Sequence, residues 1–259
     1  MALKEYGNAG TIGVLTPQAN TTVEPELWAL LPAHWSMLNA RLTSDKGTIE
    51  DRLVDYTTKF AETSGQFANA PVDVLTAACT GASYLIGQQA EARLVDQVQA
   101  RRNLPFLTAA LASVAALRAM GARKIALLTP YPESLNVHST PYWESFGFQV
   151  VAKAGPELET SAFHPIYAMT GPGVLASYRR LSADSGADAV LMLGTGMATL
   201  HPMIAGHAEG LIPAISCNVA LVWAAVQKTT WDKVSDGDLQ AWITGRQWAD
   251  RLNVMYPAP

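Results

Sequence analysis

The sequence predicts an α/β protein built from two pseudo-symmetric lobes, each a parallel sheet flanked by helices. Short apolar runs that end in Gly, Pro or Thr alternate with segments of helical periodicity, which is typical of buried parallel strands joined by helices. Three segments of the first half also recur in the same order in the second half. The matched pairs are Ile12–Pro17 with Ile125–Pro130, Asp73–Gly81 with Asp188–Gly196, and Leu104–Thr108 with Ile212–Ser216.

This internal repeat predicts the domain organisation. Two copies of one βα-rich unit are too few for a solenoid, so we expect two facing lobes with the ligand site in the cleft between them. The expected first lobe comprises residues 1–118 plus 217–259, and the expected second lobe comprises residues 119–216. Because no low-complexity linker separates the repeats, we expect the lobes to be tightly joined.

Composition excludes several functional classes. The chain has 259 residues, of which 49% are hydrophobic, and a formal net charge of -4, so it can bury a large core and offers no basic surface for nucleic acid. No apolar stretch reaches the ~20 residues of a membrane helix, and the first residues lack a signal-peptide core. We therefore expect a cytoplasmic protein without membrane contact, whose two cysteines remain free thiols.

The N-terminal elements follow from local signals. Thr11–Leu15 is β-branched and apolar and predicts a first buried strand, which Pro17 ends. Thr21 and Glu24 have the spacing of a capping box, and Pro25 is tolerated in a first helical turn. A helix is therefore expected to begin near residue 21.

The rest of the first half continues the alternation. Helical spacing of Ile49, Leu53, Tyr56 and Phe60 predicts a core-facing helix that leads into a strand at Val72–Ala78. The following elements are a helix after Cys79, a strand at Leu104–Thr108, and a helix marked by Leu111, Val114 and Leu117 that Gly121 closes.

The second half repeats this plan and ends in a helical tail. Cys217 and Asn218 begin an apolar helix with Asn218 as its cap, and a last helix spans about Leu239–Leu252, packed on the first lobe or at a dimer interface. The preceding elements are strands at Lys124–Leu128, Phe148–Val151 and Val190–Leu193, with helices around Pro141–Phe146 and Val174–Leu181.

Cys79 is the leading candidate for a catalytic residue. It directly follows the Val72–Ala78 strand and precedes a helix, and the carboxyl ends of parallel strands are where α/β proteins place chemistry. Amides at a helix start lower a thiol pKa, so Cys79 could act as nucleophile or proton carrier; the alternative is a small buried core residue. Cys217 also precedes a helix, but its apolar surroundings favour a structural role.

Polar groups at neighbouring strand ends predict an anion site. Thr80 with Gly81, and Thr195 with Gly196, each offer a hydroxyl and free amides at a helix start, and two such turns across a cleft suit a small carboxylate or dicarboxylate. Tyr131 could donate a hydrogen bond to an oxyanion or enolate, or be a loop aromatic. Thr16, Asn20 and Thr129 lie at adjacent strand ends, where Asn20 and Thr21 could instead serve only as caps.

No metal or nucleotide site is predicted. The histidines lack metal-ligand spacing, and Gly194-Thr195-Gly196 lacks the third glycine of a dinucleotide loop, where Thr199 stands. The five histidines are His34, His138, His164, His201 and His207.

These motifs resemble one known family. In order, they resemble the signatures of the aspartate/glutamate racemase superfamily, and within it the maleate cis–trans isomerase and arylmalonate decarboxylase group. The resemblance covers nearly the whole chain. The segments that carry it are Thr16–Glu26, Ala78–Gly81, Leu128–Tyr131, Gly194–Gly196 and Ile212–Ser216.

The resemblance implies two flavodoxin-like lobes about a pseudo-twofold axis, a cofactor-free site between them and a homodimer. By position, Cys79 is similar to the family's first-lobe cysteine and Asn20 to a substrate-binding asparagine. Thr80, Tyr131 and Thr195 fall where the carboxylate and oxyanion contacts arise. The position of the second-lobe cysteine is Gly194 here, which argues against a racemase that needs a proton donor on each face.

Three functions remain open. Cys79 could add to a double bond, as in a maleate-type isomerase, or protonate the intermediate of an arylmalonate-type decarboxylase. His201 or Tyr167 could then replace the missing donor. The third alternative is a non-catalytic protein that binds carboxylates.

Overall fold

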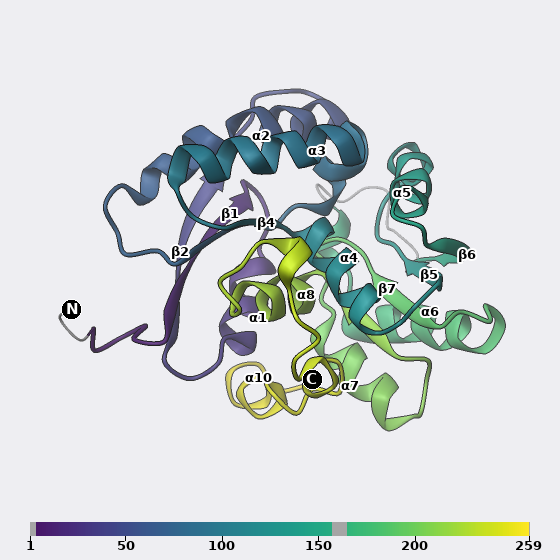
Figure 1. Cartoon of the computed structure of the whole chain (residues 1–259). Helices are drawn as coiled ribbons and strands as arrows, with labels where there is room; N and C mark the ends of the chain where they lie inside the picture. Colours follow the sequence, from purple (N-terminus) through teal and green to yellow (C-terminus); the bar gives the residue numbers. More distant parts are fainter. Residues whose placement is uncertain (1–3, 157–164, 259) are drawn as a thin grey trace.

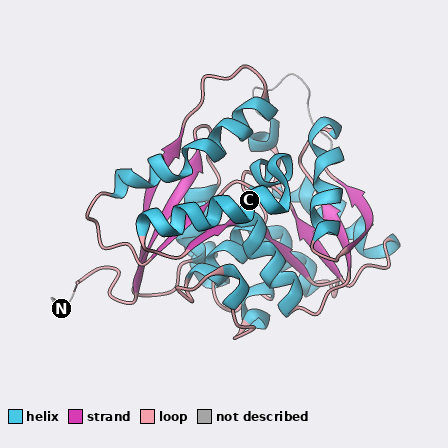
Figure 2. Cartoon of the chain, turned by 45° about the horizontal axis from the view of Figure 1, so that its top comes forward, coloured by secondary structure: helices cyan, strands magenta, loops and turns pink. Residues whose placement is uncertain are grey.

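The computed structural model describes residues 4–156 and 165–258 and contains two four-stranded parallel sheets. The sheets have the strand orders β2-β1-β3-β4 and β6-β5-β7-β8, which are the same order displaced by four strands (Figure 1). The two groups of strands stand apart, with helices between and around them (Figure 2). The predicted two-lobed α/β architecture is confirmed.

The first sheet is built around β1, which is buried at every position and pairs with both β2 and β3. Its strands are β1 (Gly10–Pro17), β2 (Trp35–Leu42), β3 (Val74–Ala77) and β4 (Phe106–Thr108). Its helices are α1 (Val23–Leu30), α2 (Ile49–Thr63), α3 (Thr80–Arg102) and α4 (Ala109–Ala119).

The second sheet repeats this plan around β5. Its strands are β5 (Lys124–Leu128), β6 (Gln149–Ala154), β7 (Ala189–Met192) and β8 (Ala214–Ser216). The helices that follow them are α5 (Glu133–Ser145), α6 (Gly171–Asp184), α7 (Leu200–Ala208) and α8 (Cys217–Ala225), and the chain ends with α9 (Leu239–Ile243) and α10 (Ala249–Met255).

The repeated aspartates hold corresponding strands together. Asp73 Oδ2 accepts a hydrogen bond from the Thr11 amide at 2.7 Å, beside the start of β1. Asp188 Oδ2 accepts from the amides of Arg123 and Lys124 at 2.8 Å, beside the start of β5. These amide contacts hold the pKa of Asp188 below its usual value. The aspartate of the repeated motif therefore has a structural role in each lobe.

Helices α4 and α8 pack against each other at the centre of the molecule. Each follows the last strand of a sheet, and every residue of α8 is buried. This apolar contact holds the two sheets in one body. Because α8 contacts α1, β3 and β4 and α10 contacts α1, we retain residues 217–259 as a proposed part of the first lobe.

Two elements were not predicted from the sequence. Strand β2 lies at a sheet edge and carries polar Asn39 and Arg41 beside Leu38, which is 39% exposed, so its apolar alternation is weak. Helix α7 contains Pro202 and Gly206, which weaken a helical pattern. Both elements are specified by packing within the fold.

The expected start of α1 was wrong in detail. The Thr21–Glu24 capping box does not form: α1 begins at Val23, and the Asn20 side-chain oxygen accepts from the amides of Thr22 at 2.9 Å and Val23 at 3.1 Å. Glu24 instead bonds side chains of β2. Asn20 therefore fixes the turn between β1 and α1.

Other boundaries also differ from expectation. Ile49 is 39% exposed rather than core-facing. Helix α5 begins at Glu133, well before Pro141. Ser216, rather than Asn218, caps α8 by accepting from the Val219 amide. The single last helix is two helices, because Gly245 has a φ of +82° that interrupts the pattern.

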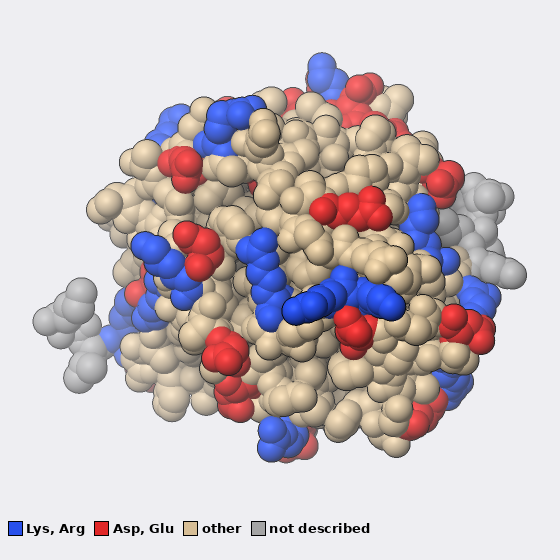
Figure 3. Space-filling model, turned by 45° about the vertical axis from the view of Figure 1, so that its right-hand side comes forward, with Lys and Arg blue, Asp and Glu red and all other residues tan. Residues whose placement is uncertain are grey.

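Blue and red side chains are interspersed over the face shown in Figure 3, as the mild net charge suggests. Within the described residues, no helix combines the length and the apolar character that crossing a membrane requires.

The close approach of α6 and α7 gives a stability prediction. A Cβ at Gly206 would lie 2.1 Å from Cε1 of Tyr178, a side chain that is 1% exposed and bonds the Ile212 carbonyl through its hydroxyl. We expect Gly206→Ala to lower the free energy of unfolding by about 1–3 kcal/mol in a denaturant titration.

Gly65→Ala is the matched control, because nothing lies within 4 Å of a Cβ built there and its φ is not left-handed. This variant should change stability by less than about 1 kcal/mol. Equal stability of the two variants would show that the packing of Tyr178 is not tight.

Candidate functional site

A cavity of about 380 Å³ lies where the carboxyl ends of strands from both sheets meet. Four residues with polar side chains line it from strand ends: Asn20, Cys79, Tyr131 and Thr195 follow β1, β3, β5 and β7 in turn. Most of its remaining wall is apolar, from Ile49, Leu53, Leu135 and Ile166 together with three prolines. Ligands of α/β proteins bind at such strand ends.

Cys79 is the N-cap residue of α3 and is 5% exposed. Burial raises the pKa of its thiol to about 11, and the Ala82 amide, which favours the thiolate, offsets only part of this effect. The expectation that the helix start lowers this pKa was therefore wrong, because desolvation outweighs the amide. At neutral pH the Cys79 side chain is a protonated thiol.

Asn20 and Thr195 join the two lobes beside this thiol. Asn20 Nδ2 donates to the Thr195 hydroxyl at 3.1 Å, and that hydroxyl donates to the Ala78 carbonyl at 2.7 Å. Both residues are at most 4% exposed. The Thr195 hydroxyl is thus occupied by protein partners, whereas an amide nitrogen carries two hydrogens, so Asn20 can offer one to a ligand.

Tyr131 presents a neutral hydroxyl to the cavity. Its oxygen lies 3.0 Å from Oγ1 of Thr80, and its ring makes an edge contact with Tyr84. Burial raises the pKa of Tyr131 well above its usual value, so the phenol keeps its proton at neutral pH. It can therefore donate a hydrogen bond to a developing oxyanion.

The remaining predicted site residues differ in their relation to the cavity. Gly196 lines the cavity, whereas Thr16, Thr80, Gly81 and Gly194 are not among its lining residues. The Thr16 hydroxyl is buried without a hydrogen-bond partner among the described residues. The structure therefore brings Gly196, but not the other four, to the cavity surface.

Gly194 cannot hold a second thiol in this backbone conformation. Its φ is +81°, and a Cβ would lie 2.7 Å from Cγ of Pro130 and 3.3 Å from the hydroxyl oxygen of Tyr131. A side chain would be strained and would collide with its neighbours. The Tyr131 hydroxyl thus lies beside the place where a second-lobe cysteine would project.

The two proposed substitutes for that cysteine differ in position. Tyr167 lines the cavity, and burial raises its pKa. His201 instead lines a different cavity, where its Nε2 lies 2.8 Å from the Tyr256 carbonyl oxygen. His201 is therefore removed from the candidates. His164 lies outside the described residues.

Cys217 is buried at 1% exposure and does not line the cavity. Its thiol lies within hydrogen-bonding reach of Ser113, Thr80 and the Gly194 amide, and burial raises its pKa to about 11. Both cysteines are free thiols. Among the described residues, no group of three or more His, Cys, Asp and Glu side chains could hold a metal ion.

Sequence reasoning missed two charged residues. Arg52 carries the only charge among the described lining residues. It lies three residues after Ile49 and four before Tyr56, so its place on their helical face was a usable signal. Glu26 is 6% exposed, and burial raises its pKa to about 7; only the fold could show that it is enclosed.

Glu26 supports the turn that carries Thr195. Its carboxylate accepts from the Thr199 amide at 2.6 Å and from Asn218 Nδ2 at 2.7 Å. Asn218 Nδ2 also donates to the Thr195 carbonyl at 3.1 Å. The side chain expected to cap α8 therefore links a first-lobe carboxylate to the second-lobe turn.

Fold and site together define a two-lobed α/β protein with a single thiol exposed to the cavity between its sheets. Comparison with known proteins specifies this class. The chain belongs to the arylmalonate decarboxylase family, whose pattern, described as "Arylmalonate decarboxylase", matches residues 12–241.

Curated relatives are similar at low identity. A maleate isomerase of Pseudomonas putida is 31% identical over 150 residues, which span 54% of this chain and 60% of that protein. A maleate isomerase of Nocardia farcinica is 27% identical over 219 residues, which span 81% of this chain and 86% of that protein. The chain thus matches about three fifths of the length of the Pseudomonas putida relative.

Solved structures share the fold. The maleate isomerase Iso from Pseudomonas putida S16 superposes with a TM-score of 0.74 at 25% identity and covers 84% of this chain and 92% of its own. Arylmalonate decarboxylase superposes with a TM-score of 0.68 at 21% identity, and the match covers 84% of this chain and 92% of the decarboxylase chain. The second likeness is one of fold alone.

The two thiols should differ in reactivity. We expect N-ethylmaleimide to alkylate Cys79 before Cys217, because only Cys79 lines the cavity. With a pKa of about 11, the Cys79 rate should rise about tenfold per pH unit between pH 7 and 9. Peptide mass spectrometry of wild type and Cys79→Ser measures both rates. A pH-independent rate would show that the thiol is already ionised.

Proposed function

We propose that the protein is a cofactor-independent enzyme in which Cys79 acts on a small carboxylate or dicarboxylate bound between the sheets. One observation carries this proposal: the cavity combines one thiol with the neutral donors Asn20 and Tyr131. Arg52 adds a positive charge to the lining. Such a set can hold a carboxylate and stabilise the enediolate formed beside it.

The first candidate reaction is cis–trans isomerisation of the maleate type. It is supported by curated relatives that are maleate isomerases and by a solved Nocardia farcinica isomerase mutant with a covalently bound succinylcysteine intermediate. In this reaction, the Cys79 thiolate attacks one alkene carbon and the π electrons move onto the adjacent carboxylate. The new C–C single bond rotates, and re-formation of the double bond expels the thiolate.

The second candidate is decarboxylation of a substituted malonate. Two observations favour it: the high pKa of Cys79 keeps a proton on the sulfur, and most of the cavity wall is apolar. The bond to the departing carboxylate breaks, carbon dioxide leaves and the electron pair forms an enediolate. Cys79 then gives its proton to the α-carbon, and the resulting thiolate takes a proton from water.

Product analysis distinguishes these reactions. Purified protein is incubated with maleate and with a panel of aryl- and alkylmalonates, and products are followed by NMR. We expect fumarate or a monoacid, and a fall of kcat/KM by about 10²–10⁴ in Cys79→Ser. Cys217→Ser is the matched control and should retain activity, because Cys217 does not line the cavity.

If the protein turned over neither maleate nor any of the malonates, both candidate reactions would be contradicted. Stabilisation by the same acids in wild type and in Cys79→Ala would then support the non-catalytic binding protein. Cytoplasmic location and a homodimeric state remain proposals as well; size-exclusion chromatography with light scattering measures the latter.

The pH dependence separates the two roles of Cys79. With a pKa of about 11, only ~10⁻⁴ of the free enzyme carries a thiolate at pH 7. If the thiolate attacks, kcat/KM for maleate should rise about tenfold per unit from pH 7 to 10. If the thiol donates a proton, kcat/KM for a malonate should stay flat over this range and fall near pH 11. A profile that falls between pH 7 and 9 would contradict both roles.

A further inference from the structure

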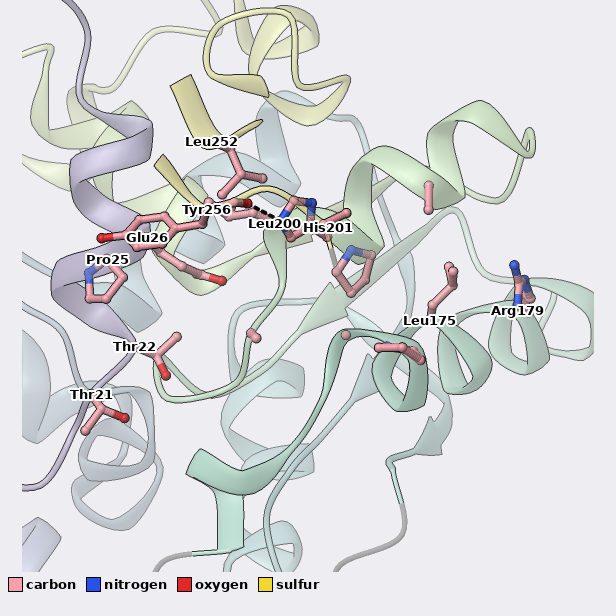
Figure 4. Close-up of a pocket in the computed structure, with 16 residues that line it drawn as sticks. Thr21, Thr22, Pro25, Glu26, Leu175, Arg179, Leu200, His201, Leu252 and Tyr256 are labelled. Atoms are coloured by element: carbon pink, nitrogen blue, oxygen red, sulfur yellow. Dashed lines mark hydrogen bonds between the residues drawn. The ribbon is translucent and has the colours of Figure 1, made fainter. Parts of the chain in front are cut away.

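A second cavity of about 490 Å³ lies on the other side of the loops that line the Cys79 cavity. Figure 4 shows it between α1, which carries Glu26, and α7, which carries His201, with Leu252 of α10 above them. Arg179 on α6 lies at its far end. Helix α1 belongs to the first sheet and α6 and α7 to the second, so an occupant would contact both lobes.

The two cavities share one thin wall. Asn20 and Thr195 line the Cys79 cavity, whereas Thr22 and Ala198 of the same two segments line the second cavity. The Thr22 hydroxyl donates to the Gly196 carbonyl at 2.8 Å across the lobes. The same two segments therefore contribute to the walls of both cavities.

Glu26 provides a second connection. It lines the second cavity, and its carboxylate bonds Thr199 and Asn218, which in turn bonds the Thr195 carbonyl. The residue is 6% exposed, so these bonds are shielded from water. Hydrogen-bond networks of this kind are one physical means by which two sites can be coupled.

The lining defines the chemical class of ligand. Its charged groups have partners within the protein: Arg179 pairs with Glu209 through two hydrogen bonds, and Glu26 bonds Thr199 and Asn218. The rest of the wall is largely apolar, with Pro25, Leu175 and Leu252. A charged ligand would lose hydration without gaining an uncommitted counter-charge, whereas a neutral apolar ligand fits the criteria of a small-molecule pocket.

We propose that this second cavity binds a small, neutral, largely apolar molecule, and that its occupancy restrains the lobes and slows access to Cys79. Because the Cys79 thiol is only 5% exposed, its alkylation should be sensitive to small movements of the cavity wall. A ligand held between α1 and α7 favours the closed arrangement. Binding there is therefore coupled to the Cys79 cavity through the shared wall.

Binding is tested with 1-aminoanthracene, which is neutral at pH 7.5 and fluoresces more strongly in an apolar site. We expect saturable binding to wild type and at least about tenfold weaker binding to Ala205→Trp, whose new ring fills the second cavity. Ala19→Trp is the matched control: Ala19 lines the Cys79 cavity and is, like Ala205, half-buried. This variant should bind as wild type does.

Two measurements on the wild-type protein do not depend on these variants. Anthracene-2-carboxylate should bind at least about tenfold more weakly than the amine. Saturating 1-aminoanthracene should slow alkylation of Cys79 by about fivefold, and should leave the rate unchanged in Ala205→Trp.

Four results would overturn the proposal. The second cavity would not be a binding site if 1-aminoanthracene failed to bind the wild-type protein. The same conclusion would follow if Ala19→Trp abolished binding of the dye and Ala205→Trp did not. Equal affinity for the carboxylate would refute the neutral class. An unchanged alkylation rate at saturation would refute the coupling.

Discussion

The architecture depends on a buried polar connection between one short segment of the first lobe and one turn of the second. Residues 20–26 meet residues 194–199 through hydrogen bonds of Asn20, Thr22 and Glu26. Asn20 and Glu26 are at most 6% exposed, so breaking their bonds would leave buried polar groups unsatisfied. The packing of α4 on α8, each of which follows the last strand of a sheet, holds the two sheets together, but this polar connection sets the geometry of the Cys79 cavity.

The same constraint explains why one thiol faces the cavity. Gly194 begins the second-lobe turn with a left-handed backbone, and a side chain there would strike Pro130 beside the Tyr131 hydroxyl. Cys79 occupies the corresponding place in the first lobe, where the backbone is extended and a side chain is allowed. Corresponding turns of the repeat therefore differ in chemistry: the first-lobe turn carries the Cys79 thiol, whereas the Gly194 turn has no side chain and lies beside the Tyr131 hydroxyl from the neighbouring strand end.

Much of the fold and of the site could be predicted from the sequence, because the repeated apolar runs and the repeated segments Asp73–Gly81 and Asp188–Gly196 specify buried strands and the turns that follow them. The α/β class, the two lobes and the placement of Asn20, Cys79, Tyr131 and Thr195 around one cavity follow from strand-end positions. Burial could not be predicted. The high pKa of the Cys79 thiol, the enclosure of Glu26 by Thr199 and Asn218, and the contact that closes Gly194 against Pro130 arise from tertiary packing, which no local pattern encodes.

The central claim is that small carboxylates bind against Cys79. It is tested most directly by the rate at which N-ethylmaleimide alkylates Cys79 in the presence of maleate or phenylmalonate, measured by peptide mass spectrometry with Cys217 as the internal reference. The account predicts saturable protection of Cys79 by at least one of these acids and no change at Cys217. Alkylation of Cys79 that is unaffected by either acid at millimolar concentration would contradict it.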